Sequence, residues 1–158
     1  GVQVDAQLRP FEEQVEDAKA RGAKVVFGAE RPQGSDLDKG FFYLPTLLTN
    51  VPDDARVSVE ETFGPVLPVF TFKTLDEAIE KANSSIFGLG SSIWTRNLIN
   101  ANKAVDKLQA GNVWVNSLHY GYDELPFGGA KASGVGREHG PEALDYYLEP
   151  KGIVIVNA

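Results

Sequence analysis

The 158-residue sequence contains no cysteine and no methionine, and it has only two histidines. Without cysteine there can be no disulfide and no thiolate ligand for a metal ion. His119 and His139 lack the short helical spacing of a zinc motif. We therefore expect no metal site. The missing thiol also excludes a cysteine nucleophile from these residues.

Basic charge and long apolar runs are scarce as well. Fifteen Lys and Arg against 22 Asp and Glu give a net charge of −7, whereas a nucleic-acid surface is normally basic. No apolar run approaches the ~20 residues that span a bilayer, and the first residues have neither region of a signal peptide. We therefore expect neither a nucleic-acid nor a membrane partner, and a cytoplasmic location.

Helical and strand patterns alternate along the chain. Apolar spacing and capping residues predict four helices. The first runs from residue 5 to Gly22, the second begins at residue 75 after a capping box formed by Thr74 and Glu77, the third begins at residue 98 after the N-cap Asn97, and the fourth runs from Pro141 to Tyr147. Apolar, β-branched segments predict strands at 24–27, 41–48, 66–72, 91–95, 112–116 and 152–156. This alternation predicts an α/β fold with an open, mainly parallel sheet and flanking helices, incomplete at its N-terminal end.

One unusual string is Glu60-Glu61-Thr62-Phe63-Gly64-Pro65-Val66. The carboxylate of Glu61 suits the two hydroxyls of a ribose, because an ionised carboxylate accepts charge-assisted hydrogen bonds. The ring of Phe63 can pack against a nicotinamide or its ribose. Gly64-Pro65 predicts a turn that holds both side chains before a strand. A solvated glutamate and a core phenylalanine beside a turn is the plainer alternative.

A second string follows in Pro126-Phe127-Gly128-Gly129-Ala130-Lys131-Ala132-Ser133-Gly134-Val135-Gly136-Arg137-Glu138. Its four glycines within nine residues allow close backbone packing or positive φ. It does not match a phosphate loop, because no Lys-Ser or Lys-Thr pair follows the last glycine of the pattern.

Taken together, the two strings resemble the C-terminal third of the NAD(P)-dependent aldehyde dehydrogenase family. The resemblance also covers Phe42-Tyr43-Leu44-Pro45-Thr46 and the stretch from Ala110 to Asn116. It implies that Glu61 and Phe63 contact NAD or NADP, with the choice between the two left open. It further implies that Glu138 is a buried carboxylate that helps to relay protons. A salt bridge from Glu138 to Arg137 or Lys131, or simple exposure, is the alternative.

The resemblance also implies a wall of the pocket for a small-molecule aldehyde substrate, whose identity stays open. The candidate substrate-binding residues are Asn116, Leu118, His119, Tyr120, Gly121, Tyr122 and Phe127. In this family a cysteine thiolate attacks the aldehyde, hydride passes to NAD(P)+, and water hydrolyses the resulting thioester to the carboxylic acid. Because this chain has no cysteine, we predict that it is inactive by itself.

The organisation that the resemblance implies has two parts. Residues 1–149 correspond to the C-terminal part of a catalytic domain, and residues 150–158 to a strand that pairs with a neighbouring subunit in a homodimer or homotetramer. The absence of an initial Met favours a fragment of a longer enzyme. The alternative is a short, non-catalytic homologue that acts as a binding or assembly module.

Overall fold

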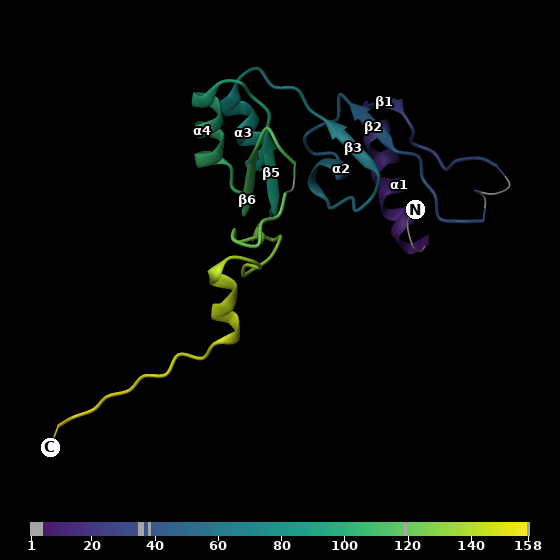
Figure 1. Ribbon diagram of the computed structural model, residues 1–158. Helices are drawn as coiled ribbons and strands as arrows, with labels where there is room; N and C mark the ends of the chain where they lie inside the picture. Colours follow the sequence, from purple (N-terminus) through teal and green to yellow (C-terminus); the bar gives the residue numbers. More distant parts are fainter. Residues whose placement is uncertain (1–4, 35–36, 38, 119, 158) are drawn as a thin grey trace. The chain divides into compact units, whose positions relative to one another are not determined.

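The computed structural model describes residues 5–34, 37, 39–118 and 120–157, with side chains from Leu8 onward (Figure 1). The chain divides into two compact units, Gly1–Thr71 and Phe72–Ala158. Each unit is a small α/β arrangement in its own right.

The first unit packs one long helix against a three-stranded sheet. Helix α1 (Asp5–Ala20) precedes β1 (Lys24–Phe27), β2 (Thr46–Thr49) and β3 (Val66–Val69), which lie in the order β1-β2-β3. Strand β1 runs antiparallel to β2, and β3 runs parallel to it. A one-turn helix, α2 (Arg56–Val59), which the sequence pattern did not predict, lies in the connection from β2 to β3.

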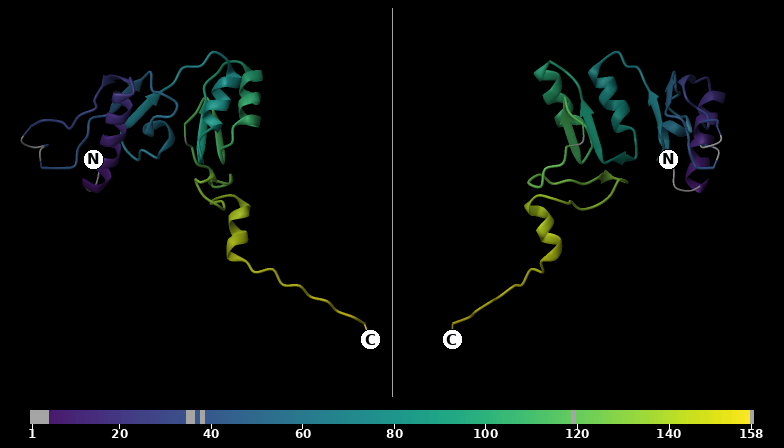
Figure 2. Two further views of the ribbon diagram at one scale, coloured as in Figure 1. Left: turned by 180° about the vertical axis from the view of Figure 1, so that it is seen from behind. Right: turned by 45° about the vertical axis from the view of Figure 1, so that its right-hand side comes forward.

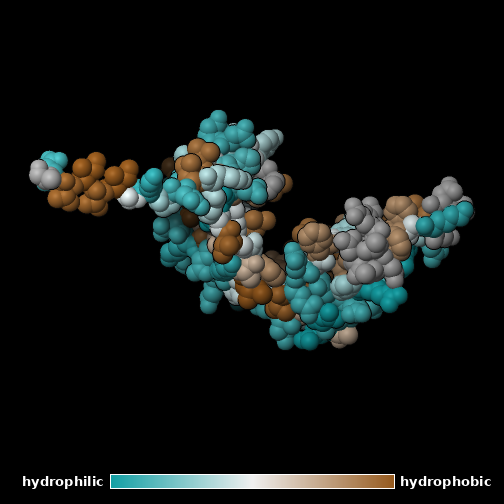
Figure 3. Space-filling view, turned by 90° about the horizontal axis from the view of Figure 1, so that it is seen from below, coloured by the Kyte–Doolittle hydropathy of each residue, from teal (hydrophilic) through white to brown (hydrophobic). Residues whose placement is uncertain are grey.

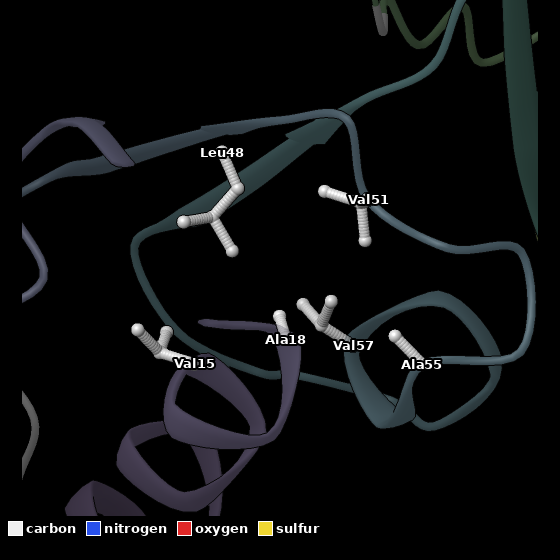
Figure 4. Close-up of a cluster of buried hydrophobic side chains, with 6 residues drawn as sticks. All are labelled: Val15, Ala18, Leu48, Val51, Ala55 and Val57. Atoms are coloured by element: carbon white, nitrogen blue, oxygen red, sulfur yellow. The ribbon is translucent and has the colours of Figure 1, made fainter. Parts of the chain in front are cut away.

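The core of this unit lies between α1, β2 and the region around α2 (Figure 4). Its buried members come from all three: Val15, Ala18, Leu48, Val51, Ala55 and Val57. The predicted end of α1 at Gly22 is confirmed, with φ at 99°. The Gly22 N–H donates to the Lys19 carbonyl at 3.0 Å and the Ala23 N–H to the Ala18 carbonyl at 2.9 Å. This paired pattern needs the left-handed conformation that glycine adopts without steric cost.

The described residues of the second unit form two helices, two short strand pairs and a 3₁₀ helix. Its elements are α3 (Leu75–Asn83), β4 (Phe87–Gly88), β5 (Gly90–Ile93), α4 (Leu98–Lys107), β6 (Asn112–Val115), β7 (Ala130–Lys131) and η1 (Pro141–Tyr147). Strands β5 and β6 pair in parallel, and β4 and β7 pair antiparallel. Helices α3 and α4 lie side by side next to the β5–β6 pair (Figures 1 and 2).

The predicted caps of α3 and α4 are present. Thr74 Oγ1 accepts the Glu77 N–H at 3.2 Å, and Asn97 Oδ1 accepts the Ile99 N–H at 2.9 Å. The reciprocal half of the capping box is displaced by one residue, because Glu77 Oε2 accepts the N–H of Lys73 rather than that of Thr74. These local hydrogen bonds satisfy helix N–H groups that have no partner within the helix.

The α/β class and the flanking helices agree with the prediction, but the described strands do not form one mainly parallel sheet. They form three small sheets with two parallel and two antiparallel pairings. Parallel neighbours need a crossover connection, whereas the connection from β1 to β2 contains no helix in the described residues and permits an antiparallel return.

The C-terminal segment has no partner strand in the part of the chain that the structure describes. Residues 152–156 belong to no helix or strand, and Ile153, Val154, Ile155 and Val156 are all strongly exposed. Figure 3 shows the apolar side chains of this segment uncovered. The division at residue 149 and the role of this segment in assembly stay predictions.

Candidate functional site

The first candidate region is the loop of residues 60–65, between α2 and β3. Phe63 has φ at 46°, a left-handed conformation that is uncommon for a bulky residue and that the surrounding structure must support. The residue is 78% exposed. The predicted alternative, a core phenylalanine, is therefore not what this chain shows. The loop displays the aromatic ring to solvent.

Two adjacent glutamates in this loop have different environments. Glu60 Oε1 accepts from Arg56 Nε at 2.8 Å, and Glu60 Oε2 accepts from Gln14 Nε2 at 3.2 Å. The hydrogen bond from Arg56, followed by the one from Gln14, holds the pKa of Glu60 below its usual range. The exposed Glu61 carboxylate makes no hydrogen bond or ion pair within the described residues. Glu60 therefore anchors the loop, and Glu61 is available to a ligand.

Helix α1 supports this loop from beneath. Gln14 is only 1% exposed, and its Nε2 also donates to the Glu61 carbonyl at 3.3 Å. Gly64 lies on the ring of Phe11, where an added Cβ would be 2.5 Å from Cδ1. Phe11 is fully buried and meets Tyr43 edge-on, with ring centroids 5.0 Å apart. Burial, with smaller charge effects, raises the pKa of Tyr43 to about 12.

The second candidate region is an open cavity of about 340 Å³ in the second unit. The glycine-rich string forms most of its wall, together with Leu89 and Tyr146. Phe127 and Glu138 both line it. Their backbones form an isolated antiparallel bridge, in which each N–H donates to the other residue's carbonyl at 2.7 Å. The two predicted site residues of this string are thus brought together.

Glu138 is exposed in this chain, so the buried carboxylate that the resemblance implied is not formed by the described residues. The alternative salt bridges are not formed either. Arg137 Nη1 donates to the Gly129 carbonyl at 2.9 Å and to the Gly136 carbonyl at 2.7 Å. Lys131 Nζ donates at 2.8 Å to the Asn83 carbonyl at the C-terminal end of α3. In this chain Glu138 therefore matches the third alternative, simple exposure. Its role as a proton relay stays a prediction.

The candidate substrate loop, residues 117–125, follows β6. Leu118, Tyr120, Gly121 and Tyr122 are exposed on it, whereas His119 lies outside the described residues. Trp114 Nε1 donates to the Tyr120 carbonyl at 3.1 Å and ties the loop to β6. The exposed side chains are open to a ligand, and their role in substrate binding stays a prediction.

Asn116 makes two side-chain hydrogen bonds to the backbone of Thr95, which could not be predicted from its position in the sequence. Its Oδ1 accepts the Thr95 N–H at 2.8 Å, and its Nδ2 donates to the Thr95 carbonyl at 2.9 Å. These two bonds continue the β5–β6 pairing past the last residues of both strands.

His139, next to Glu138, pairs through Nδ1 with Asp123 Oδ1 at 3.3 Å.

Two polar residues that shape these regions were missed at the level of sequence. Gln14 interrupts the apolar face of α1, and Asn112 starts the apolar strand β6 directly after Gly111. A polar side chain inside an otherwise apolar pattern was the available signal, because buried amides require hydrogen-bond partners. Within the described residues no group of three His, Asp or Glu side chains is arranged to hold a metal ion, and no described helix combines the length and apolarity needed to cross a membrane.

Comparison with known proteins matches the aldehyde dehydrogenase family model to residues 2–153. An aldehyde dehydrogenase of Enchytraeus buchholzi is 43% identical over 156 residues, covering 98% of this chain and 31% of that protein. The betaine aldehyde dehydrogenase of Bacillus subtilis is 41% identical over 142 residues, covering 90% of this chain and 29% of that protein.

Solved structures give the same result. Apo betaine aldehyde dehydrogenase of Staphylococcus aureus matches with a TM-score of 0.89 and 40% identity, over 94% of this chain and 30% of that one. The structure of that enzyme in complex with NAD+ matches with a TM-score of 0.87, over 92% of this chain and 29% of that one. The chain therefore spans about 30% of the length of the proteins it matches.

Proposed function

The chain belongs to the aldehyde dehydrogenase family, and from this premise we propose that it forms the C-terminal part of the catalytic domain of an NAD(P)-dependent enzyme that oxidises aldehydes to carboxylic acids. The sequence has no cysteine, so the thiolate that forms the thiohemiacetal and thioester comes from residues outside it. By itself the 158-residue chain is inactive. Its contribution is to hold the cofactor and to form one wall of the aldehyde pocket.

The observation that carries this proposal is the pairing of an unengaged carboxylate with a displayed aromatic ring in residues 60–65. The Glu61 carboxylate has no partner in the described chain, and the Phe63 ring is exposed at a positive φ. This combination fits the ribose hydroxyls and the apolar face of a nicotinamide. The structure of the Staphylococcus aureus relative in complex with NAD+ supports the same class of cofactor.

The four residues Glu61, Phe63, Phe127 and Glu138 have distinct roles in the proposed reaction. The bound cofactor supplies the hydride acceptor. Glu61 orients the ribose by accepting from its hydroxyl groups, and Phe63 restricts where the nicotinamide lies, which lowers the entropic cost of reaching the reactive geometry. Phe127 lines the cavity of the second unit, which we propose as part of the aldehyde pocket. Glu138 accepts and passes on a proton once the rest of the enzyme covers it.

The proposal is tested by replacing the matching segment of Staphylococcus aureus betaine aldehyde dehydrogenase with this chain and following NADH formation. We expect the swapped enzyme to be active. Glu61→Gln should raise the KM for NAD+ about 10-fold or more, because a hydrogen bond to a charged group contributes about 1.5–3 kcal/mol. The matched control is Glu80→Gln, since Glu80 is exposed on α3 and engages no side-chain partner in the described residues.

A soluble but inactive swapped enzyme would contradict the proposal, as would equal KM values for the Glu61 and Glu80 variants. NADH formation by the homogeneous 158-residue chain with short, aromatic or carboxylated aldehydes would contradict the predicted inactivity of the segment.

The alternative function, a non-catalytic binding or assembly module, is favoured by one observation. The apolar side chains of residues 153–156 are exposed and unpaired within the described residues, and such a segment invites pairing with another strand. In our proposal these residues add to a sheet edge of a second copy and so give a homodimer or homotetramer. This assembly is compatible with the catalytic proposal.

A further inference from the structure

Asn112, the first residue of β6, makes two hydrogen bonds to the glycine-rich string. Its Nδ2 donates to the Pro126 carbonyl at 3.0 Å, and its Oδ1 accepts the Gly128 N–H at 3.2 Å. One side-chain amide therefore binds the residues on both sides of Phe127. Because a side-chain amide offers both a donor and an acceptor, it can hold an extended backbone in a single register.

The close approach of the string to β6 depends on the neighbour of Asn112. A Cβ on Gly111 would collide with the carbonyl oxygen of Gly128. Only glycine at this position lets the string come near enough for the amide of Asn112 to reach both of its partners.

The bonds of Asn112 also reach Glu138 indirectly. Phe127 lies between the two bonded residues and makes the two-bond bridge to Glu138. Phe127 and Glu138 are both cavity-lining residues. The chain of contacts runs from β6 through the amide of Asn112 to the Phe127 backbone, and from there to Glu138.

We propose that Asn112 is a positioning residue, which fixes Phe127 and, through it, Glu138 at the wall of the cavity. The role of the cavity as part of the aldehyde pocket rests on the proposed function. The clamp, by which we mean the two hydrogen bonds from the Asn112 side chain to Pro126 and Gly128, does not depend on that function. Asn112 itself does not line the cavity.

The test compares amide hydrogen exchange by NMR in the 158-residue chain and in three variants. Asn112→Ala removes both bonds. Asn112→Asp keeps the acceptor for the Gly128 N–H and removes the donor to Pro126. Asn102→Ala is the matched control, because Asn102 is exposed on α4 with no side-chain partner in the described residues. The reference amide is that of Asn116, which donates to the Ile93 carbonyl at 2.8 Å.

We expect Asn112→Ala to speed exchange about 10-fold at the amides of Phe127, Gly128 and Glu138, with the Asn116 amide nearly unchanged. Asn112→Asp should restore protection at Gly128, and Asn102→Ala should resemble the parent chain. Unchanged exchange at Phe127 and Glu138 would overturn the clamp. An equal acceleration at Asn116 would also overturn it, because that result indicates general loss of stability.

The swapped enzyme then separates positioning from folding. Asn112→Ala should lower kcat/KM for the aldehyde several-fold and leave the KM for NAD+ unchanged. An unchanged kcat/KM beside altered exchange would confine Asn112 to folding and refute the positioning role. If the swapped enzyme is inactive with Asn112 intact, the proposed function fails, while the exchange rates still decide whether the clamp exists.

Discussion

Replacing Gly64 with alanine is the sharpest test of how α1 supports the loop that carries Glu61 and Phe63. The new Cβ would lie 2.5 Å from Cδ1 of Phe11 and 2.9 Å from its Cε1 and Cγ. These separations are well inside van der Waals contact. Gly64 is not among the residues with positive φ, so alanine meets a steric conflict and no backbone strain.

The magnitude follows from how little Phe11 can move. Its ring is fully buried and is held edge-on by Tyr43, so it cannot turn into solvent to relieve the conflict. Overpacking of this kind typically destabilises by about 1–3 kcal/mol. For a protein of this size a loss of ~2 kcal/mol corresponds to a fall in Tm of roughly 4–8 °C.

Urea denaturation followed by far-UV circular dichroism measures the loss. Gly121→Ala is the control, because a Cβ at Gly121 has no atom within 4 Å, and we expect its free energy of unfolding to change by less than about 0.5 kcal/mol. In the double variant with Phe11→Leu, the smaller side chain should accommodate the Cβ, so the two losses should couple by about 1 kcal/mol or more. Losses that simply add would refute the contact between Gly64 and Phe11 as the source of the strain.

Two further outcomes are expected. The Arg56 N–H donates to Asp17 Oδ2 at 2.9 Å and is the main reason that the pKa of Asp17 lies below its ordinary value. The unfolded state therefore binds more protons in acid, so stability should fall between about pH 5 and pH 2. Calorimetry should show a shallower fall for Asp17→Asn, and an unchanged slope would contradict this. In sedimentation velocity, Ile155→Lys should shift the chain toward monomer and Ile155→Val should not; equal distributions would argue against pairing through residues 152–156.

The elements that could be predicted from the sequence depend on near neighbours in the chain. The N-caps at Thr74 and Asn97 and the stop at Gly22 each involve hydrogen bonds across a few residues, so the local pattern contains the necessary information. The strand of residues 112–116 was expected for the same reason, and the structure has it as Asn112–Val115. The order of strands in space was not predictable in this way, because β7 pairs with β4 across more than forty residues.

The candidate site shows the same division. Glu61 and Phe63 could be chosen from the sequence because their string is distinctive. Their environments could not be predicted from the sequence, since the difference between Glu60 and Glu61 depends on a hydrogen bond from Gln14, which lies 46 residues before Glu60. The expected burial of Glu138 stays a prediction for a related reason. Burial is a property of whatever packs over a side chain, and the described residues place nothing over this one.

By itself, then, the sequence determined the family, through two ordered strings, and the absence of a thiol nucleophile, through composition. It also determined the ends of several helices, because those ends depend on short-range hydrogen bonds and on the freedom of glycine. Only the tertiary structure decided which glutamate is anchored and which has no side-chain partner among the described residues, that Asn116 serves the β5–β6 pairing, and that Asn112 holds both flanks of Phe127. Those outcomes follow from contacts between residues distant in the chain, and local patterns of residue type do not specify such contacts.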